Sequence, residues 1–435
     1  MDRDAEVIVV GAGVMGGSIA LELAKRGLNV VVIDKLGAPG HGSTSASSAI
    51  VRFNYSTIDG VATSWESKQC WVEWSDHVGV IDDAGMARFQ QTGMVVLDTP
   101  IAPREKVTPL LLAAGVPYEE WDAATLRQRV AGVDTGRYWP PKGIDEPAFF
   151  DGATEELGAL FMPDAGFIDD PQLAAHNLIF AAQSLGALTM FNAVVSDVIR
   201  VNGRAAGVRL ENGTVIHAPV VVNAAGPWST QLNRLAGVGA DFSIGVRPMR
   251  QEVHYLPAPI GYNVAGQLGP SLADMDLGTY MRPGPGDTIY VGGTAPECDP
   301  LDWIDNPDDA NPAVTATTYA NQATRAARRL STLRVPTSPK GVAGVYDVAE
   351  DWTPIYDRTE LAGFYVAMGT SGNQFKNAPL VGLFLATLIE RVEAGHDHDG
   401  DPVRYVGEHT GNIINLGAFS RKRSFNASSA GNVMG

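Results

Sequence analysis

Residues 5–17, AEVIVVGAGVMGG, and residues 29–34, NVVVID, decide the fold of this chain. Their apolar runs predict two buried strands, and the segment between them has the pattern of a helix. A G-x-G-x-x-G motif that follows a strand, opens a helix and precedes an acid by about 20 residues is a strong signal for a dinucleotide site. We therefore expect an α/β fold with a Rossmann-like domain at the start of the chain.

The conspicuous residues of this motif each have a physical role at such a site. Gly11 permits the tight turn, Gly13 lets the backbone approach a pyrophosphate, and Gly16 allows the helix to pack on the strand. The helix N-terminus offers unpaired N–H groups and partial positive charge to that pyrophosphate. Asp34 is placed to accept hydrogen bonds from adenosine ribose hydroxyls. The alternative is a tight βαβ turn that binds nothing.

The composition is that of a globular protein with more than one core. A chain of 435 residues predicts two domains, and 45% hydrophobic with 19% charged residues excludes a disordered chain. The net charge of −17 argues against a nucleic acid partner, because a polyanion would be repelled.

Neither the cysteines nor the hydropathy indicates an extracellular or membrane setting. Cys70 and Cys298 lie far apart and match no metal motif or disulfide framework. The chain passes from MDRD (residues 1–4) directly into a strand, so we expect no signal peptide. The longest apolar candidate, residues 378–389, is too short to span a membrane. We expect a cytoplasmic protein without a membrane span or a metal site.

Periodicity predicts further elements along the chain. Helices are expected over residues 60–80, 171–185 and 313–333, and strands over 189–191, 193–201, 205–210 and 215–217. Asp169 or Asp170 is a candidate N-cap, and the arginines of residues 325–329 are expected on a solvated face. A strand and turn over 363–369, a loop over 370–376 and a helix from residue 378 complete the pattern.

Four motifs occur in the order and spacing of one family. They are residues 5–34, GSTSASSAIVR (42–52), VVVNAAGPWS (220–229) and GTSGNQFKNAPLVG (369–382). With them the chain resembles the D-amino-acid-oxidase-like flavoproteins, and most of all the branch of sarcosine oxidase and dimethylglycine dehydrogenase. The resemblance covers nearly the whole chain.

The resemblance implies FAD and a discontinuous two-domain layout. The FAD-binding domain would comprise residues 1–85, 150–225 and 335–400, and a mixed-sheet substrate domain would comprise 86–149 and 226–334, followed by a tail over 401–435 that we expect to be ordered. By motif matching, the residues implied to contact FAD are Gly11, Gly13, Val14, Met15, Gly16, Asp34, Lys35, Ser43, Thr44, Ser48, Val195, Ala225, Gly226, Gly372, Asn373, Gln374, Phe375 and Lys376.

The same resemblance implies a substrate site made by two cations. Arg52 and Lys376 match the residues that hold the substrate carboxylate above the flavin in sarcosine oxidase. Both lie in segments expected near the core, where a cation needs either an acidic partner or an anionic ligand. An internal salt bridge is the alternative for each.

The implied reaction is oxidation of the C–N bond of a small amino acid or N-alkyl amino acid. A hydride equivalent would pass to flavin N5, and water would hydrolyse the resulting imine. One alternative is a 2-hydroxy-acid or polyol-phosphate dehydrogenase that uses His254 as a base. Another is a non-catalytic flavin-binding component of a larger complex.

The chain departs from the family pattern at two places. It has no cysteine in residues 343–346 and no histidine in residues 44–47, where relatives attach the flavin, so we expect non-covalent FAD. It has no lysine between Lys142 and Lys340, and Tyr290 lies near the position of the lysine that favours reaction with O₂. The electron acceptor, O₂ or another carrier, stays open, as does the oligomeric state. Tyr255, Tyr280, Arg282 and Tyr346 are weaker pocket candidates.

Overall fold

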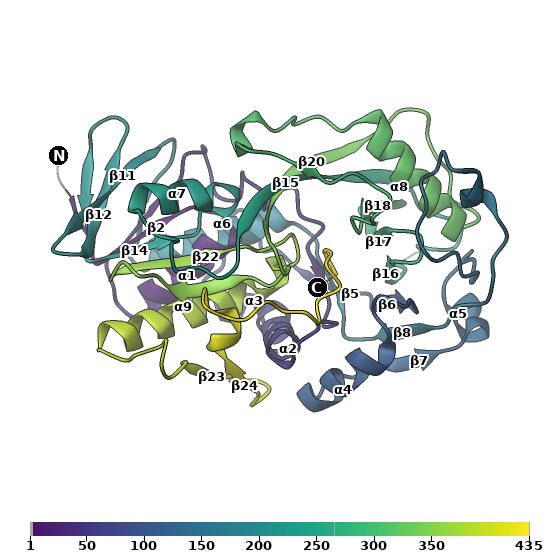
Figure 1. Ribbon diagram of the computed structural model, residues 1–435, viewed down its shortest axis with the longest axis horizontal. Helices are drawn as coiled ribbons and strands as arrows, with labels where there is room; N and C mark the ends of the chain where they lie inside the picture. The colour runs from purple at the N-terminus through teal and green to yellow at the C-terminus, as the bar shows by residue number, and fades with distance from the viewer. Residues whose placement is uncertain (1–2, 265, 435) are drawn as a thin grey trace.

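The computed structural model describes residues 3–264 and 266–434 and forms two lobes, which lie side by side in Figure 1. The first lobe is built on a six-stranded sheet in which neighbours are parallel, except for one edge strand. In spatial order its strands are β10 (Leu188–Met190), β3 (Val30–Ile33), β2 (Val7–Val10), β14 (Val220–Asn223), β22 (Phe364–Met368) and the antiparallel β21 (Ile355–Arg358).

Both faces of this sheet are covered, which explains its continuous apolar strands. Val7 and Val9 face a core shared with helices α1 (Val14–Lys25), α6 (Pro171–Ser184) and α9 (Ala378–Glu393). Ile8 and Val10 face a second core. That core is shared with α7 (Ser229–Ala236) and with a four-stranded sheet of β1 (Arg3–Asp4), β13 (Val215–His217), β12 (Arg204–Leu210) and β11 (Val195–Val201).

The second lobe is built on a nine-stranded mixed sheet. The strands in spatial order are β19 (Asp302–Trp303), β15 (Val246–Pro257), β18 (Thr288–Gly293), β17 (Thr279–Gly284), β16 (Ser271–Asp274), β6 (Met94–Leu97), β8 (Ala159–Met162) and β7 (Glu119–Trp121), with β20 (Gly341–Ala349) also paired to β15. Helix α8 (Ala316–Arg329) packs on one face through Tyr319, Ala323 and Ala326. The other face contributes Met249 and Tyr280 to the core of the first lobe, so the two lobes meet there.

Most elements predicted from periodicity are present. The helix expected over 60–80 is α2 (Ile58–Val72) followed by α3 (Trp74–Val78), and α6 begins at an Asp170 side chain that accepts a hydrogen bond from the Leu173 N–H at 2.9 Å. The strands expected between 189 and 217 are β10 to β13. The remaining elements are α4 (Arg104–Ala114), α5 (Ala123–Arg129) and a small sheet of β4 (Ile50–Val51), β9 (Gly166–Ile168) and β5 (Phe89–Gln91).

The expectation for the arginines of α8 is wrong at two positions. Arg325 and Arg329 are fully buried, and only Arg328 is half-exposed. Arg329 pairs with Asp274 at 2.7 Å and Asp276 at 2.8 Å. Its acidic partners lie more than 50 residues away in sequence, so no local pattern signalled that these charges would be neutralised inside the protein.

Sheet membership differs from the expected domain boundaries at two places. Strand β20 falls in a segment assigned to the FAD domain, yet it pairs with β15 of the second lobe along nine residues. Helix α7 falls in the expected substrate domain, yet it packs on β11 of the first lobe. Within the described residues the tail contains β23 (Arg404–Val406), β24 (Ile413–Asn415) and a 3₁₀ turn over Leu416–Phe419.

None of the helices in the described part of the chain has the length and apolar character that a membrane crossing needs.

Candidate active site

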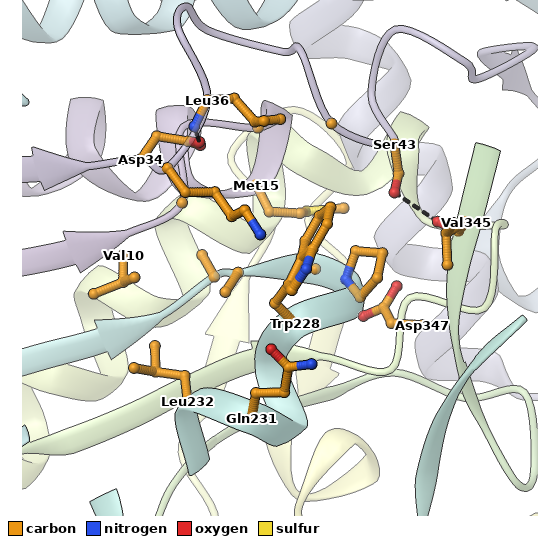
Figure 2. Close-up of a pocket in the computed structure, with 18 of the residues that line it drawn as sticks. Val10, Met15, Asp34, Leu36, Ser43, Trp228, Gln231, Leu232, Val345 and Asp347 are labelled. Carbon is orange, nitrogen blue, oxygen red and sulfur yellow. Dashed lines mark hydrogen bonds between the residues drawn. The ribbon is translucent and has the colours of Figure 1, made fainter. Parts of the chain in front are cut away.

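A cavity of about 670 Å³ opens where the parallel strands of the first lobe end (Figure 2). Gly11 lies in its wall with a φ of +112°, and a Cβ there would lie 2.2 Å from the Ala224 carbonyl oxygen. A Cβ on Gly16 would lie 1.9 Å from the Gly11 carbonyl oxygen. These two glycines therefore let β2, α1 and the end of β14 approach closely, as the motif predicts.

The N-terminus of α1 points its backbone donors toward this cavity. Its N-cap, Gly13, makes no side-chain capping bond, while the Val14 N–H is bonded to the Thr44 hydroxyl at 3.1 Å. Asp34 lies at the end of β3 and accepts hydrogen bonds from the backbone N–H groups of Ala12 at 2.6 Å and Leu36 at 2.7 Å, the latter visible in Figure 2. The carboxylate is thus held at the cavity rim. A helix N-terminus next to a fixed acid suits a pyrophosphate and a ribose.

Most residues implied by the resemblance line this cavity. Those that do are Gly11, Gly13, Val14, Met15, Asp34, Lys35, Ser43, Thr44, Val195, Ala225, Gly226, Gly372, Gln374 and Phe375. Ser48, Asn373 and Lys376 instead line a smaller neighbouring cavity. Gly16 lines neither and acts in helix packing.

The sequence reasoning missed three residues that close the rim of the large cavity. Trp228, Gln231 and Asp308 all line it. The Trp228 indole N–H donates to the Asp308 carboxylate at 3.0 Å, and Lys35 pairs with the same carboxylate while its ammonium lies 4.6 Å from the Trp228 ring centroid. Trp228 belongs to the motif of residues 220–229, which could have identified it. Asp308 comes from the second lobe and carries no local signal.

The smaller cavity, of about 50 Å³, lies at the junction of the lobes and shares Ser47, Tyr346, Gly372 and Phe375 with the large one. Segments far apart in the chain line it. The other lining residues are Ser48, Ala49, Ile50, Arg52, Met94, Tyr280, Asn373, Lys376, Val433 and Met434.

The structure brings Arg52 and Lys376 together in this cavity. They are 4% and 3% exposed, and the Arg52 guanidinium carbon and the Lys376 Nζ lie 4.9 and 4.8 Å from the centroid of the same Tyr55 ring. Within the described residues neither cation forms a salt bridge. The Arg52 Nη1 donates to the Asn54 carbonyl and its Nη2 to the Val433 carbonyl, each at 2.7 Å, and the Lys376 Nζ donates to the Asn373 carbonyl at 2.5 Å.

The electrostatics of the pair follow from this burial. Burial lowers the pKa of the Arg52 guanidinium from its usual value. Burial and, after it, the Arg52 charge hold the pKa of the Lys376 ammonium well below its usual value. Two like charges without a carboxylate form a site that an anion would stabilise.

Helix α2 and strand β4 fix the two cations in place. Arg52 directly follows β4, which pairs with β9. The Lys376 carbonyl accepts hydrogen bonds from the Trp71 indole N–H at 2.6 Å and the Ser67 hydroxyl at 2.7 Å, both on α2. Trp71 also stacks on Trp74 with ring centroids 4.3 Å apart.

Two tyrosines of the second lobe form the wall opposite the cations. The Tyr280 hydroxyl lies 3.0 Å from the Ser48 hydroxyl, and both Tyr280 and Tyr346 line the small cavity. Burial raises the pKa of each tyrosine, which keeps both hydroxyls protonated. Tyr280 and Tyr346 therefore offer neutral hydrogen-bonding groups to a ligand.

The structure does not bring His254 to the site. Its ring packs against Tyr319 of α8, with centroids 5.2 Å apart, and its Nδ1 lies 2.7 Å from the Gln322 side-chain oxygen. Side chains alternate along a strand, so His254 points to the α8 face of β15 while its neighbour Tyr255 points to the opposite face. The expected role of His254 as a base is thus contradicted by its position.

Tyr290 lies on the face that looks toward the first lobe but lines neither cavity. It is directly opposite Tyr255 on β15 and Arg282 on β17. The Arg282 guanidinium carbon lies 4.1 Å from the Tyr290 ring centroid, and the two tyrosine rings lie 4.4 Å apart. At this position, near which the family resemblance implies a lysine in oxidases, the chain has a phenol stacked on a buried arginine.

Comparison with known proteins places these features in context. The family model described as FAD dependent oxidoreductase matches residues 6–388. Glycine oxidase of Geobacillus kaustophilus is 27% identical over 91% of this chain and 96% of its own length. One component of the anaerobic glycerol-3-phosphate dehydrogenase of Escherichia coli K12 is 26% identical over 67% of this chain and 48% of its own length. Among solved structures, L-proline dehydrogenase from P. horikoshii superposes with a TM-score of 0.76 at 22% identity, over 97% of this chain and 98% of that one.

Proposed function

The chain belongs to the FAD-dependent oxidoreductase family, and from that premise we propose that it oxidises the C–N bond of a small amino acid or N-alkyl amino acid. The observation that carries this proposal is the pair of buried cations, Arg52 and Lys376, which have no acidic partner among the described residues and line a cavity that adjoins the cofactor cavity. A substrate carboxylate would neutralise them. The relatives that act on glycine and proline support the same substrate class.

The residues of the large cavity suit FAD. Gly11, Gly13 and the N-terminus of α1 would hold the pyrophosphate, and Asp34 would bind the ribose. The loop of residues 372–375 lies where the large cavity meets the small one, so it would border the redox-active ring. Bound FAD supplies a two-electron acceptor.

The chain's own contribution to the reaction is mainly orientation. Arg52 and Lys376 would fix the carboxylate, which leaves the amine and its C–H bond on the side of the cavity that joins the cofactor site. Tyr280 and Tyr346 offer hydroxyls to the polar end of the substrate, and Ile50, Met94 and Phe375 are among the apolar residues of the wall. No strong base is required if the amine binds in its neutral form.

We propose that FAD is bound without a covalent link. No cysteine or histidine is found among the described residues that line either cavity. Acid precipitation tests this: all yellow colour should remain in the supernatant, and colour in the pellet would contradict it.

The position of Tyr290 bears on the electron acceptor. Without a lysine at the position of Tyr290, developing negative charge on O₂ is less stabilised there, so a dehydrogenase that uses another acceptor is as compatible with this site as an oxidase. Stopped-flow reoxidation in air distinguishes the two, because an oxidase would return quickly to the oxidised spectrum.

Anaerobic bleaching of the flavin tests the proposed substrate class. The panel should contain glycine, sarcosine, proline and D-amino acids, with sarcosine methyl ester as the matched ligand that lacks the carboxylate charge. We expect at least one free amino acid to bleach the flavin and the ester to fail. Bleaching by glycerol 3-phosphate alone would instead support the polyol-phosphate alternative, which the position of His254 disfavours.

A further inference from the structure

The C-terminal segment lies between the two lobes in Figure 1, and its residues Val433 and Met434 line the small cavity. Its first part is firmly anchored. Arg421 pairs with Asp357 and with Asp399, Arg423 pairs with Asp351 at 2.8 Å, and the Asn426 side chain donates to the Ser56 hydroxyl at 3.0 Å. Anchoring by ion pairs ends at this point.

The part that follows, residues 427–434, is held differently. Its own backbone N–H groups form local hydrogen bonds, such as Met434 N–H to the Asn432 side chain at 2.8 Å. The Val433 carbonyl links it to the rest of the described chain by accepting a hydrogen bond from Arg52 Nη2 at 2.7 Å, and the Asn432 amide lies 4.0 Å from the Met275 sulfur. Val433 and Met434 are 8% and 5% exposed and line the small cavity. We call residues 427–434 the strap.

We propose that the strap is a substrate-displaced element of the active site, and that Val433 and Met434 determine the size of amine that the site accepts. This inference rests on the proposed function. The Val433 carbonyl oxygen occupies a donor of Arg52 that a substrate carboxylate needs, so the two oxygens compete for the same guanidinium.

The size of the cavity leads to the same conclusion. With the strap in place about 50 Å³ remains, which is room for roughly four water molecules. Sarcosine has six non-hydrogen atoms and proline eight, so a substrate of this class whose carboxylate is bound by Arg52 gains room when the strap shifts. The ion pairs of Arg421 and Arg423 keep its base in position while residues 427–434 move.

The Val433 carbonyl and a carboxylate compete for Arg52. The apparent affinity for the carboxylate is therefore the intrinsic affinity multiplied by the fraction of molecules in which the strap leaves Arg52 free. The test compares the FAD-loaded full chain with a chain that ends at Asn426. Acetate is the probe, its binding is followed by the change in the flavin absorbance spectrum, and thermal unfolding checks that both chains fold. We expect the shortened chain to bind acetate at least about threefold more tightly. Equal or weaker binding would overturn the proposal.

A full-length variant provides the same test without shortening the chain. Val433→Ser with Met434→Ser removes apolar contacts that keep the strap closed, so it should also tighten acetate binding. Phe425→Ser is the matched control, because Phe425 is 58% exposed and precedes the anchor at Asn426. It should leave acetate binding unchanged. If the double variant binds acetate with the same affinity as the unsubstituted chain, the proposed displacement of the strap is contradicted.

The proposed role of Met434 in selecting substrates by size can be measured separately. Met434→Ala should raise the ratio of kcat/KM for the bulkier of two amine substrates over the smaller, and an unchanged ratio would contradict a role in size selection. The outcomes also separate the two proposals. If acetate binds neither the full nor the shortened chain, the carboxylate site itself is wrong. If it binds both equally, only the strap is wrong.

Discussion

The two adjoining cavities differ in how much of their lining comes from the second lobe and the C-terminal segment. The cofactor cavity is built mostly from short continuous motifs, in which one strand, turn and helix supply the critical glycines and Asp34 follows directly after the next strand. The small cavity combines two continuous segments, within residues 47–52 and 372–376, with side chains from β6, β17, β20 and the strap. A local motif tolerates little change at any of its positions, whereas a dispersed site can change specificity one residue at a time.

The largest effect is expected from a substitution in the glycine motif of the cofactor cavity. Gly11→Val places a side chain where a Cβ already lies 2.2 Å from the Ala224 carbonyl, at a φ of +112°. We expect it to cost about 3 kcal/mol of folding free energy and to abolish FAD retention. Gly27→Ala is the control, since its φ is +79° with nothing within 4 Å, and should cost only about 1 kcal/mol and keep FAD. Urea unfolding and the absorbance of the purified protein measure both; a yellow, stable Gly11→Val protein would refute the motif's role.

Substitutions in the small cavity should change substrate binding and leave FAD binding unchanged. Arg52→Met removes one of the two cations, and we expect a loss of about 3 kcal/mol in carboxylate binding, or roughly a 100-fold rise in KM, with FAD retained. Arg137→Met, a change at a surface ion pair with Glu155, serves as the control. Steady-state kinetics and flavin absorbance provide the readouts. An unchanged KM would show that the carboxylate binds elsewhere.

Asp34 tests how far the cofactor cavity depends on a single acid. Asp34→Ala removes the acceptor of the Ala12 and Leu36 N–H groups and the expected partner of the ribose. We expect FAD affinity to fall roughly 10- to 100-fold, from a loss of about 1–3 kcal/mol. Titration of the apoprotein with FAD, followed by fluorescence quenching, measures it. Asp34→Asn, which keeps one acceptor oxygen, should lose less, and equal losses in both variants would argue against hydrogen bonding as the cause.

These contrasts explain what the sequence could and could not predict. Gly11, Gly13 and Asp34 were predictable because their roles depend on neighbours in the same motif. Arg52 and Lys376 came from the resemblance alone, because nothing local brings residues 324 positions apart together. The roles of Asp308 and Val433 were not predictable, since each reaches its cavity by packing between lobes. Arg329 was placed wrongly because its partners, Asp274 and Asp276, lie on a distant strand and loop.

The pH dependence of ligand binding gives a smaller but more specific effect. Because the pKa of Lys376 is lowered, part of its population is neutral in the free protein above that pKa, and a carboxylate favours the protonated form. Binding therefore takes up a proton, and carboxylate affinity should fall as pH rises through the lowered pKa, by at most about tenfold per pH unit. Acetate titrations across pH measure this. Lys376→Met should bind more weakly but without this slope, and a slope that survives the substitution would exclude Lys376 as its origin.

The smallest effect on activity is expected at His254. Because its ring packs between β15 and α8, away from both cavities, His254→Ala should change kcat/KM by less than about twofold. The same variant should lose about 2 kcal/mol of stability, since it opens a cavity and removes the His254 ring from the Gln322 side-chain oxygen, although the Gln322 amide still donates to the Glu252 carbonyl. Kinetics and urea unfolding on one preparation separate the two effects. A large loss of activity in a variant that keeps FAD and stability would favour the alcohol dehydrogenase alternative. His254 would then have to reach the flavin, which requires a rearrangement of β15. With activity retained, orientation by Arg52 and Lys376 is left as the chain's main contribution to the chemistry.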